Sequence, residues 1–168
     1  LTNDSGLLHI GEALKKYGPP ADSRVADVTV RQVLHHMGGF QSNEREDDPV
    51  ILGTKSGFMP PKGRERDPRS WRKEDVLVPI LKRKLDAAPG TTYIYSNAGY
   101  VVLGLVVEAA SGRSYEDYCR EAVLKPAGLP LPTVEADRRY VDSVSGWQMT
   151  PAEVLKLWQV YEPDETRL

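Results

Sequence analysis

The sequence contains a single cysteine, no long hydrophobic run and little net charge, and each of these absences excludes a class of protein. Cys119 has no second cysteine with which to form an internal disulfide, so cysteine usage does not indicate a redox compartment. No apolar run approaches the roughly 18 residues of a membrane-spanning helix. The net charge of −2 over 168 residues provides no basic field for a phosphate backbone. We therefore expect no transmembrane segment and no nucleic-acid partner.

The first twenty residues also lack the features of a targeting segment. They contain no initiator methionine, no basic segment and no continuous apolar segment, so they do not form a signal peptide and the localisation stays unassigned. The overall composition, 40% apolar and 27% charged, is ordinary for a globular domain. We expect residues 1–168 to form a single partial domain of a longer protein.

Hydrophobic periodicity and helix caps predict a mainly α-helical chain with little strand. Thr29 and Ser114 are suitable N-caps, and Thr150 and Glu153 can form a capping box. Gly38 and Gly112 are suitable helix ends. The predicted helices cover residues 7–17, 29–38, 71–85, 98–111, 114–125 and 150–161, and the predicted strands cover residues 91–95 and 139–144.

Several apolar side chains are candidates for the core. The helix from Ala98 to Ala110 is apolar nearly all round, as expected of a helix that is buried on most faces. We also expect Tyr93 and Trp147 to pack rather than to contact a substrate. In the last helix we expect four apolar side chains to face inward, those of Val154, Leu157, Trp158 and Tyr161.

Residues 41–70 are polar and are interrupted repeatedly by glycine and proline. A connection of this length is uncommon in a compact domain unless it is disordered or lies over a site. The charged residues from Arg64 to Asp75 are expected to form a solvated loop and helix start rather than a binding patch. Ser70 is expected to be the N-cap of the third helix.

The stretch Tyr95-Ser96-Asn97 lies between the predicted strand at 91–95 and the apolar helix. One interpretation is a capped turn, because asparagine favours turns and helix starts and tyrosine packs well. The other is a catalytic site in which the phenol moves a proton. An unperturbed phenol has a pKa near 10, so only about one in a thousand is ionised at pH 7. A neighbouring lysine ammonium would favour the phenolate and make it a usable base.

Three blocks of the sequence together resemble a known superfamily. They are VTVRQVLHHMGGF (residues 28–40), PGTTYIYSNAGYVVLGLVVEAASGRSYEDYCREAVLKPAGL (89–129) and SGWQMTPAEVLKLW (145–158). In order and content they are similar to the penicillin-recognising serine hydrolases, which include class C β-lactamases, D-alanyl-D-alanine carboxypeptidases and related esterases. The resemblance implies the helical region of a β-lactamase/transpeptidase-like fold, which is an α/β sandwich at full length.

That superfamily forms an acyl-enzyme with the serine and lysine of an S-x-x-K motif, a Y-x-N motif and a K-T-G-like strand. By position, the resemblance assigns Tyr95 and Asn97 to the second motif. The tyrosine would help to move the proton, the asparagine would hold substrate or lysine, and Ser96 would point away from the site. The first motif would precede Leu1 and the third would follow Leu168. We therefore find no nucleophile in the expected position and expect residues 1–168 to be inactive alone.

Two other groups of residues invite a catalytic interpretation that we do not favour. A literal S-x-x-K occurs at Ser70–Lys73, but so short a motif also arises by chance, and this one lies in a charged run. His35 and His36 are adjacent in a predicted helix, where neighbouring side chains diverge by about 100° and cannot share a metal ion. We expect a structural role for His36, and no metal or cofactor.

Two functional hypotheses follow. In the first, the chain is part of a serine hydrolase that cleaves a small acyl substrate, an ester, a peptide or a β-lactam, and the scaffold leaves that choice open. In the second, it is a non-catalytic helical module that binds a partner or an acyl ligand. If the chain is separated from the rest of such a fold, the helix at 98–110 would expose a large apolar patch and favour self-association.

Overall fold

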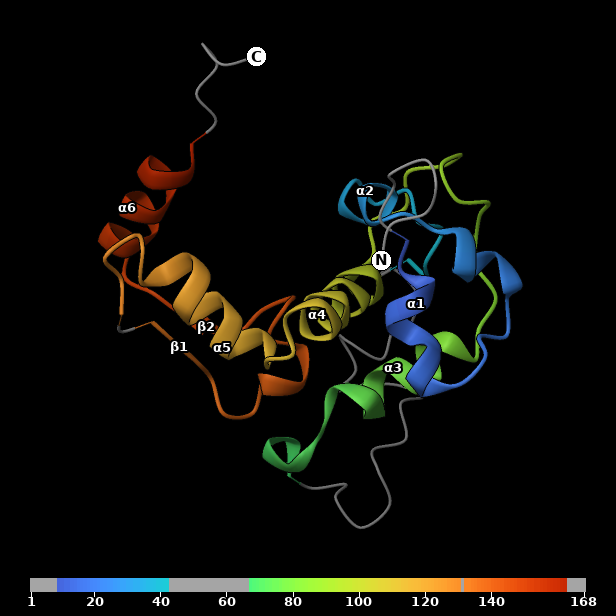
Figure 1. Cartoon of the computed structure of the whole chain (residues 1–168), viewed down its shortest axis with the longest axis horizontal. Coiled ribbons are helices and arrows are strands. Elements are labelled where there is room, and N and C mark those ends of the chain that lie inside the picture. The colour runs from blue at the N-terminus through green and yellow to red at the C-terminus, as the bar shows by residue number, and fades with distance from the viewer. Residues whose placement is uncertain (1–8, 43–66, 131, 163–168) are drawn as a thin grey trace.

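A computed structural model describes residues 9–42, 67–130 and 132–162, and within them the chain is mainly helical, as predicted (Figure 1). Most of the predicted loop at 41–70 lies outside the described residues. No helix in the described part has the length and apolar character needed to cross a membrane. The elements in chain order are α1 (Gly11–Leu14), η1 (Lys15–Tyr17), η2 (Ser23–Asp27), α2 (Val30–Leu34), η3 (Pro68–Ser70), α3 (Lys73–Leu81), α4 (Asn97–Ser111), α5 (Tyr115–Cys119), η4 (Arg120–Leu124), β1 (Thr133–Val134), η5 (Arg139–Val141), β2 (Trp147–Gln148) and α6 (Pro151–Tyr161).

The predicted first helix corresponds to α1 followed by the 3-10 helix η1, and it ends at Gly18 as the sequence indicates. Its expected start at residue 7 lies outside the described residues. A buried carboxylate then ties the next segment to the end of α3. Asp22 accepts hydrogen bonds from the N–H groups of Arg24 and Leu85, each at 3.1 Å, and from the Arg24 guanidinium. This guanidinium holds the pKa of Asp22 well below its usual range.

α2 begins where the sequence predicts but ends earlier. The Thr29 hydroxyl accepts a hydrogen bond from the Gln32 N–H at 3.1 Å, and the Gln32 side chain accepts one from the Thr29 N–H at 2.9 Å, which is a capping box. The predicted helix end at Gly38 is wrong. His35 is the C-cap, and His36 follows with a φ of 55°, in the left-handed region.

α3 also starts later than predicted. The expected N-cap role of Ser70 is wrong, because Ser70 lies in η3 and its hydroxyl donates to the Asp67 carbonyl at 2.7 Å. The N-cap is Arg72, whose N–H donates to the Asp75 carboxylate at 2.7 Å. Pro79 lies inside α3, close to its C-terminal end, where a proline removes one backbone hydrogen-bond donor.

α4 is the central helix of the fold and is capped at both ends by residues that the sequence makes suitable. The buried Ser96 hydroxyl accepts from the Gly99 N–H at 3.2 Å, and Gly112 closes the helix with a φ of 69°. α1, α2 and α3 lie on one side of α4 in Figure 1 and share its hydrophobic core. Val101, Val102 and most of their apolar neighbours on α4 are buried. The predicted exposed patch on this helix is therefore wrong, because the rest of the chain covers it.

The C-terminal part surrounds a second, smaller apolar cluster. Ser114 caps α5 as predicted, with its hydroxyl accepting from the Asp117 N–H at 3.1 Å, and the helix continues through one π-helical turn, η4. β1 and β2 pair in antiparallel fashion, with Thr133 opposite Gln148. Trp147 is half-buried and packs against this cluster, so its predicted packing role is confirmed.

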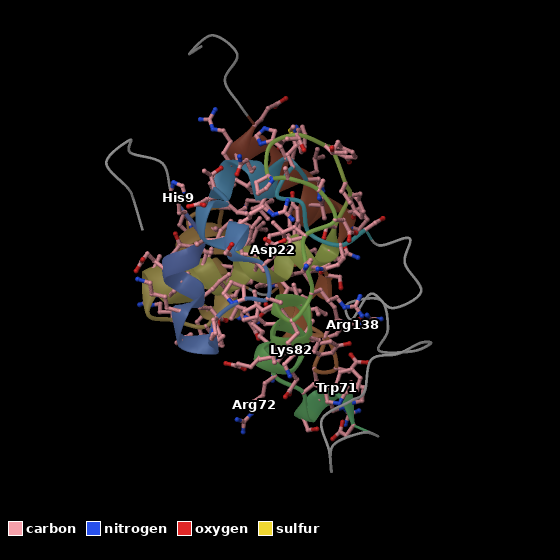
Figure 2. All side chains as sticks on the ribbon, turned by 90° about the vertical axis from the view of Figure 1, so that its right-hand side faces the viewer. His9, Asp22, Trp71, Arg72, Lys82 and Arg138 are labelled. Carbon is pink, nitrogen blue, oxygen red and sulfur yellow. The ribbon has the colours of Figure 1, made fainter. Side chains whose placement is uncertain are left out.

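Both predicted strands are wrong. Residues 91–95 form an extended loop without a regular ladder, and residues 139–144 begin with the 3-10 helix η5. η5 belongs to the larger core, where Tyr140 packs edge-on against Trp71 with ring centroids 5.0 Å apart. Figure 2 shows Trp71 and Arg138 on the same side of the molecule, away from His9.

α6 begins with the predicted capping box, in which the Thr150 hydroxyl accepts from the Glu153 N–H and the Glu153 carboxylate accepts from the Thr150 N–H. The expected inward direction is wrong for three of its four apolar side chains. Trp158 is 63% exposed, and Val154 and Tyr161 are also exposed, whereas Leu157 is half-buried against the second cluster. Among the described residues, most of the exposed large apolar side chains are thus on α6.

Candidate functional site

The segment that leads to Tyr95 is fixed to the residues that follow α2. The Ile94 N–H donates to the His36 carbonyl at 2.8 Å, and the Gly90 N–H donates to the Met37 carbonyl at 2.7 Å. These bonds join positions more than fifty residues apart in the sequence. They hold the extended loop beside the end of α2 without forming a regular strand.

Ser96 joins this loop to α4, and its two polar groups have partners. Its hydroxyl is the N-cap of α4, and its N–H donates to the imidazole Nδ1 of His36 at 3.2 Å. A serine that is buried and occupied in this way is a structural element of the turn. Its neighbour Tyr95 is 53% exposed, and Asn97, the first residue of α4, is half-buried.

The imidazole of His36 lies among three tyrosines. Its centroid is 4.5 Å from the ring of Tyr95, 5.0 Å from that of Tyr100 and 5.7 Å from that of Tyr93. Tyr100 is itself fixed, because its hydroxyl donates to the Leu34 carbonyl at 3.1 Å. Burial lowers the pKa of His36, so the imidazole is neutral at pH 7. His36 was expected to have a structural role within a helix. It lies after α2 instead, and its structural role is the contact of its ring with three tyrosines.

Tyr93 was expected to pack inside the molecule, and this is wrong. It is 66% exposed and meets His36 edge-on. Tyr93 and Tyr95 therefore both present their rings to solvent. The hydroxyl of an exposed phenol can be reached by a substrate.

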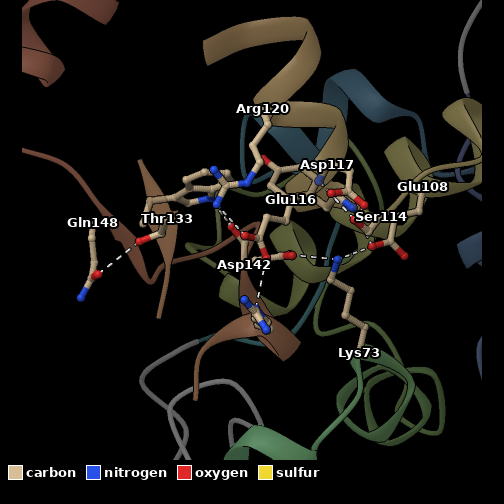
Figure 3. Close-up of polar contacts among 12 residues, drawn as sticks. Lys73, Glu108, Ser114, Glu116, Asp117, Arg120, Thr133, Asp142 and Gln148 are labelled. Atoms are coloured by element: carbon tan, nitrogen blue, oxygen red, sulfur yellow. Dashed lines mark hydrogen bonds and ion pairs between the residues drawn. The ribbon is translucent and has the colours of Figure 1, made fainter. Parts of the chain in front are cut away.

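A buried ion cluster that the sequence did not predict lies between α3, α4 and the residue after η5. Lys73 forms ion pairs with Glu108 and with Asp142, the latter at 2.9 Å (Figure 3). The side chains of Lys73, Glu108 and Asp142 are 11%, 20% and 4% exposed. The expectation that the charged stretch ending at Asp75 is solvated is therefore wrong at Lys73. A signal was available, because Glu108 is the one charged residue in the otherwise apolar α4 and needs a partner when buried.

Burial dominates the electrostatics of this cluster. It raises the pKa of Asp142 to about 6, although the Lys73 ammonium acts in the opposite direction. Burial also raises the pKa of the Tyr115 phenol and of the Cys119 thiol beside it. A thiol with a raised pKa stays protonated at neutral pH and is a poor nucleophile.

The literal S-x-x-K motif does not form a site with the Tyr95 turn. Ser70 donates to a main-chain carbonyl within η3, and Lys73 belongs to the buried ion cluster. In Figure 1, η3 lies below α3, whereas residues 86–96 pass along the upper right of the view. Within the described residues, no group of three or more His, Cys, Asp or Glu side chains is arranged to hold a metal ion.

Comparison with known proteins identifies relatives over most of the chain. The model of the family described as Beta-lactamase matches residues 2–158. A protein of Escherichia coli strain K12, provisionally named D-alanyl-D-alanine carboxypeptidase, is 29% identical over 131 residues, which are 74% of this chain and 27% of that protein. The chain thus spans about a quarter of the length of the curated relatives that it matches.

Two solved structures have a similar fold. The penicillin-binding protein from Bacillus halodurans has a TM-score of 0.65 at 22% identity, covering 91% of this chain and 51% of that chain. The D-stereospecific amidohydrolase from Streptomyces sp. has a TM-score of 0.57 at 26% identity, covering 74% and 35%. The described helices are therefore arranged as in a part of the penicillin-binding-protein fold.

Proposed function

Because the chain belongs to the Beta-lactamase family of hydrolases, we propose that Tyr95 and Asn97 are the Y-x-N motif of a serine hydrolase that works through an acyl-enzyme. The observation that carries the proposal is the Tyr95 turn itself. The exposed phenol of Tyr95 and the first residue of α4, Asn97, flank Ser96. The Ser96 hydroxyl caps α4, and the Ser96 N–H donates to the distant His36. A turn that served packing alone would bury the ring of its tyrosine, whereas that of Tyr95 is half-exposed.

In the proposed reaction a serine hydroxyl attacks the acyl carbonyl, and the carbon–oxygen or carbon–nitrogen bond of the substrate breaks. Tyr95 relays the serine proton to the leaving group, and a water molecule later releases the acid. Asn97 holds the substrate or the partner lysine. The serine and lysine are proposed to come from residues outside 1–168, in keeping with the share of the relatives that this chain spans. The 168 residues alone are then inactive.

The ion cluster supports this division of roles. A lysine that assists a nucleophilic serine must be able to exchange a proton with it. The Lys73 ammonium is instead paired with two carboxylates in a buried position. Ser70 is consequently proposed to have no nucleophilic role.

The names of two relatives suggest the first substrates to test. One is provisionally named for cleavage of a D-alanyl-D-alanine peptide and the other for D-stereospecific amide hydrolysis. We propose amides and short peptides of D-amino acids as the substrate class, with simple esters as the comparison.

The first experiment exposes residues 1–168 to a fluorescent penicillin and to a fluorophosphonate and measures the intact mass. No adduct is expected, and an adduct on Ser70 would overturn its assignment. The full gene product that contains this chain is expected to be labelled. In it, Tyr95→Phe should lower turnover about 100-fold or more, because general acid–base catalysis contributes about that much. Tyr93→Phe, at an exposed tyrosine two residues away, is the matched control and should retain activity.

Wild-type turnover in the Tyr95→Phe variant would remove this residue from the mechanism. If the full gene product is not labelled by either reagent but the chain binds an acyl ligand saturably, the non-catalytic binding module is the better description. The two hypotheses are thus separated by covalent labelling.

A further inference from the structure

Directly after α2, His36 has a left-handed backbone conformation that residues with a side chain disfavour. The His36 N–H donates to the Val33 carbonyl at 3.0 Å, and the Met37 N–H donates to the Gln32 carbonyl at 2.7 Å, the pattern of a Schellman motif. In this motif the left-handed position, here occupied by His36, is usually a glycine. His36 is the one non-glycine with positive φ among residues 9–42, 67–130 and 132–162. For a residue with a side chain, this conformation costs about 1–2 kcal/mol.

An observed outlier of this kind points to a function for the side chain. The left-handed conformation directs the imidazole onto the Tyr95 turn, where Nδ1 accepts the Ser96 N–H. With the imidazole in place, the residues around these two groups leave no room for a water molecule. Without the imidazole, the Ser96 N–H would lose this acceptor, and a buried N–H without a partner costs about 1–3 kcal/mol. The lining residues are Val33, Gly38, Phe40, Ile94 and Gly99.

We propose that His36 is the positioning residue of the Y-x-N motif. Its Nδ1 accepts the N–H of the peptide that joins Tyr95 to Ser96, and its ring contacts the ring of Tyr95 at 4.5 Å and that of Tyr100 on another side. The catalytic meaning of this role rests on the proposed function, whereas the geometric role does not. His36 acts on the reaction through Tyr95 and Asn97 and does not itself meet the substrate.

The proposal makes the turn sensitive to protonation of His36. Nδ1 can accept a hydrogen bond only in the neutral tautomer that carries its proton on Nε2, because both ring nitrogens of imidazolium are donors. The titratable groups that face the ring are three phenols, and the preceding residue, His35, has its own bond to the Arg31 carbonyl. Burial lowers the pKa of His36 below its ordinary value of about 6.5, so the bond is present at neutral pH and is lost as the pH falls through that lowered pKa.

The test measures amide hydrogen exchange by NMR on the 168-residue chain, with the rate of Ser96 corrected for the intrinsic effect of pH. In the wild type the protection of Ser96 should fall at least ten-fold as the His36 ring titrates, while that of Gly112 changes little. In His36→Gly, which keeps the backbone conformation and loses the ring, Ser96 should be unprotected at pH 7 as well. His35→Gln is the matched control at the neighbouring histidine and should behave like the wild type.

Unchanged Ser96 protection in His36→Gly, or protection in the wild type that does not follow the His36 titration, would overturn the proposal. The second measurement needs no variant, so it decides the question even if His36→Gly does not fold. Both measurements are made without a substrate. Failure of the covalent labelling experiment with these exchange results intact would therefore refute the hydrolase mechanism and leave the positioning role in place.

Discussion

Replacement of Lys73 by methionine should destabilise the protein strongly, and more at pH 7 than at pH 5. Methionine keeps much of the length of the side chain and removes the ammonium. Glu108 and Asp142 would then be left in a largely buried site without their cation. Removing one partner of a buried ion pair typically costs about 3–5 kcal/mol. For a chain of this size, that corresponds to a melting temperature lower by roughly 6–20 °C.

The pH dependence follows from Asp142. In the wild type its pKa is about 6, so the carboxyl is mostly ionised at pH 7 and mostly protonated at pH 5. Without Lys73, burial and Glu108 both favour the protonated form, and the pKa of Asp142 rises further. Holding the carboxyl protonated at pH 7 costs about 1.4 kcal/mol for the one pKa unit above 6. At pH 5 the carboxyl is protonated in both proteins, so this part of the penalty disappears.

The assay is urea unfolding of wild type and variant at pH 5 and pH 7, with the free energy extrapolated to water. Lys125→Met is the matched control, because Lys125 forms an exposed pair with Glu121 four residues earlier, and such pairs contribute about 0.5 kcal/mol or less. A loss below about 1 kcal/mol for Lys73→Met at both pH values would refute the reasoning. A loss that is larger at pH 5 than at pH 7 would refute the assignment to Asp142.

Three further predictions concern other features of the fold. Asp22→Asn should lower the free energy of unfolding by about 1–3 kcal/mol at pH 7, because buried donors lose a charged acceptor. The Arg24 guanidinium depresses the pKa of Asp22, so this stabilisation is present above about pH 4 and is lost at lower pH, which acid titration of the variant would show. Gly39→Ala should lower the free energy of unfolding in urea by about 2 kcal/mol or more, because φ is +79° and the new Cβ would clash with the main-chain oxygen of Ala87. Gly112→Ala is the control and should cost less, because φ is also positive there but the new Cβ would meet open space. Trp158→Glu should reduce self-association in sedimentation velocity relative to Trp158→Phe, because Trp158 lies among the exposed apolar side chains of α6.

The sequence predicted the helices well where a local signal sets them. The N-caps Thr29 and Ser114, the capping box at Thr150 and the C-terminal Gly112 depend on residues close in the sequence, and all four are confirmed. The predicted helix end at Gly38 failed because tertiary contacts determined it. The bonds from the extended loop to His36 and Met37 favour termination two residues earlier than the glycine suggests.

The errors in predicting which side chains are buried have a different origin. Periodicity shows which face of a helix is apolar, but it does not show whether another element of the same chain covers that face. α4 is covered by its neighbours, whereas α6 keeps its capping box and leaves Trp158 exposed. The Lys73 cluster was missed for the same reason, because its members are 35 and 69 residues from Lys73 in the sequence.

The candidate site combines a fixed backbone turn with an exposed side chain. Both helices that hold this turn, α2 and α4, are within this chain. Ser96 is tied to α4 by its hydroxyl and to the end of α2 by its N–H, and α2 is tied to α4 through Tyr100. Three bonds between two helices and one turn leave the backbone at Tyr95 little freedom, even though its ring is half in water. The position of the phenol is therefore set by contacts among residues 29–42 and 86–100. A partner lysine would change the protonation of Tyr95, and on this argument it would not need to build the turn.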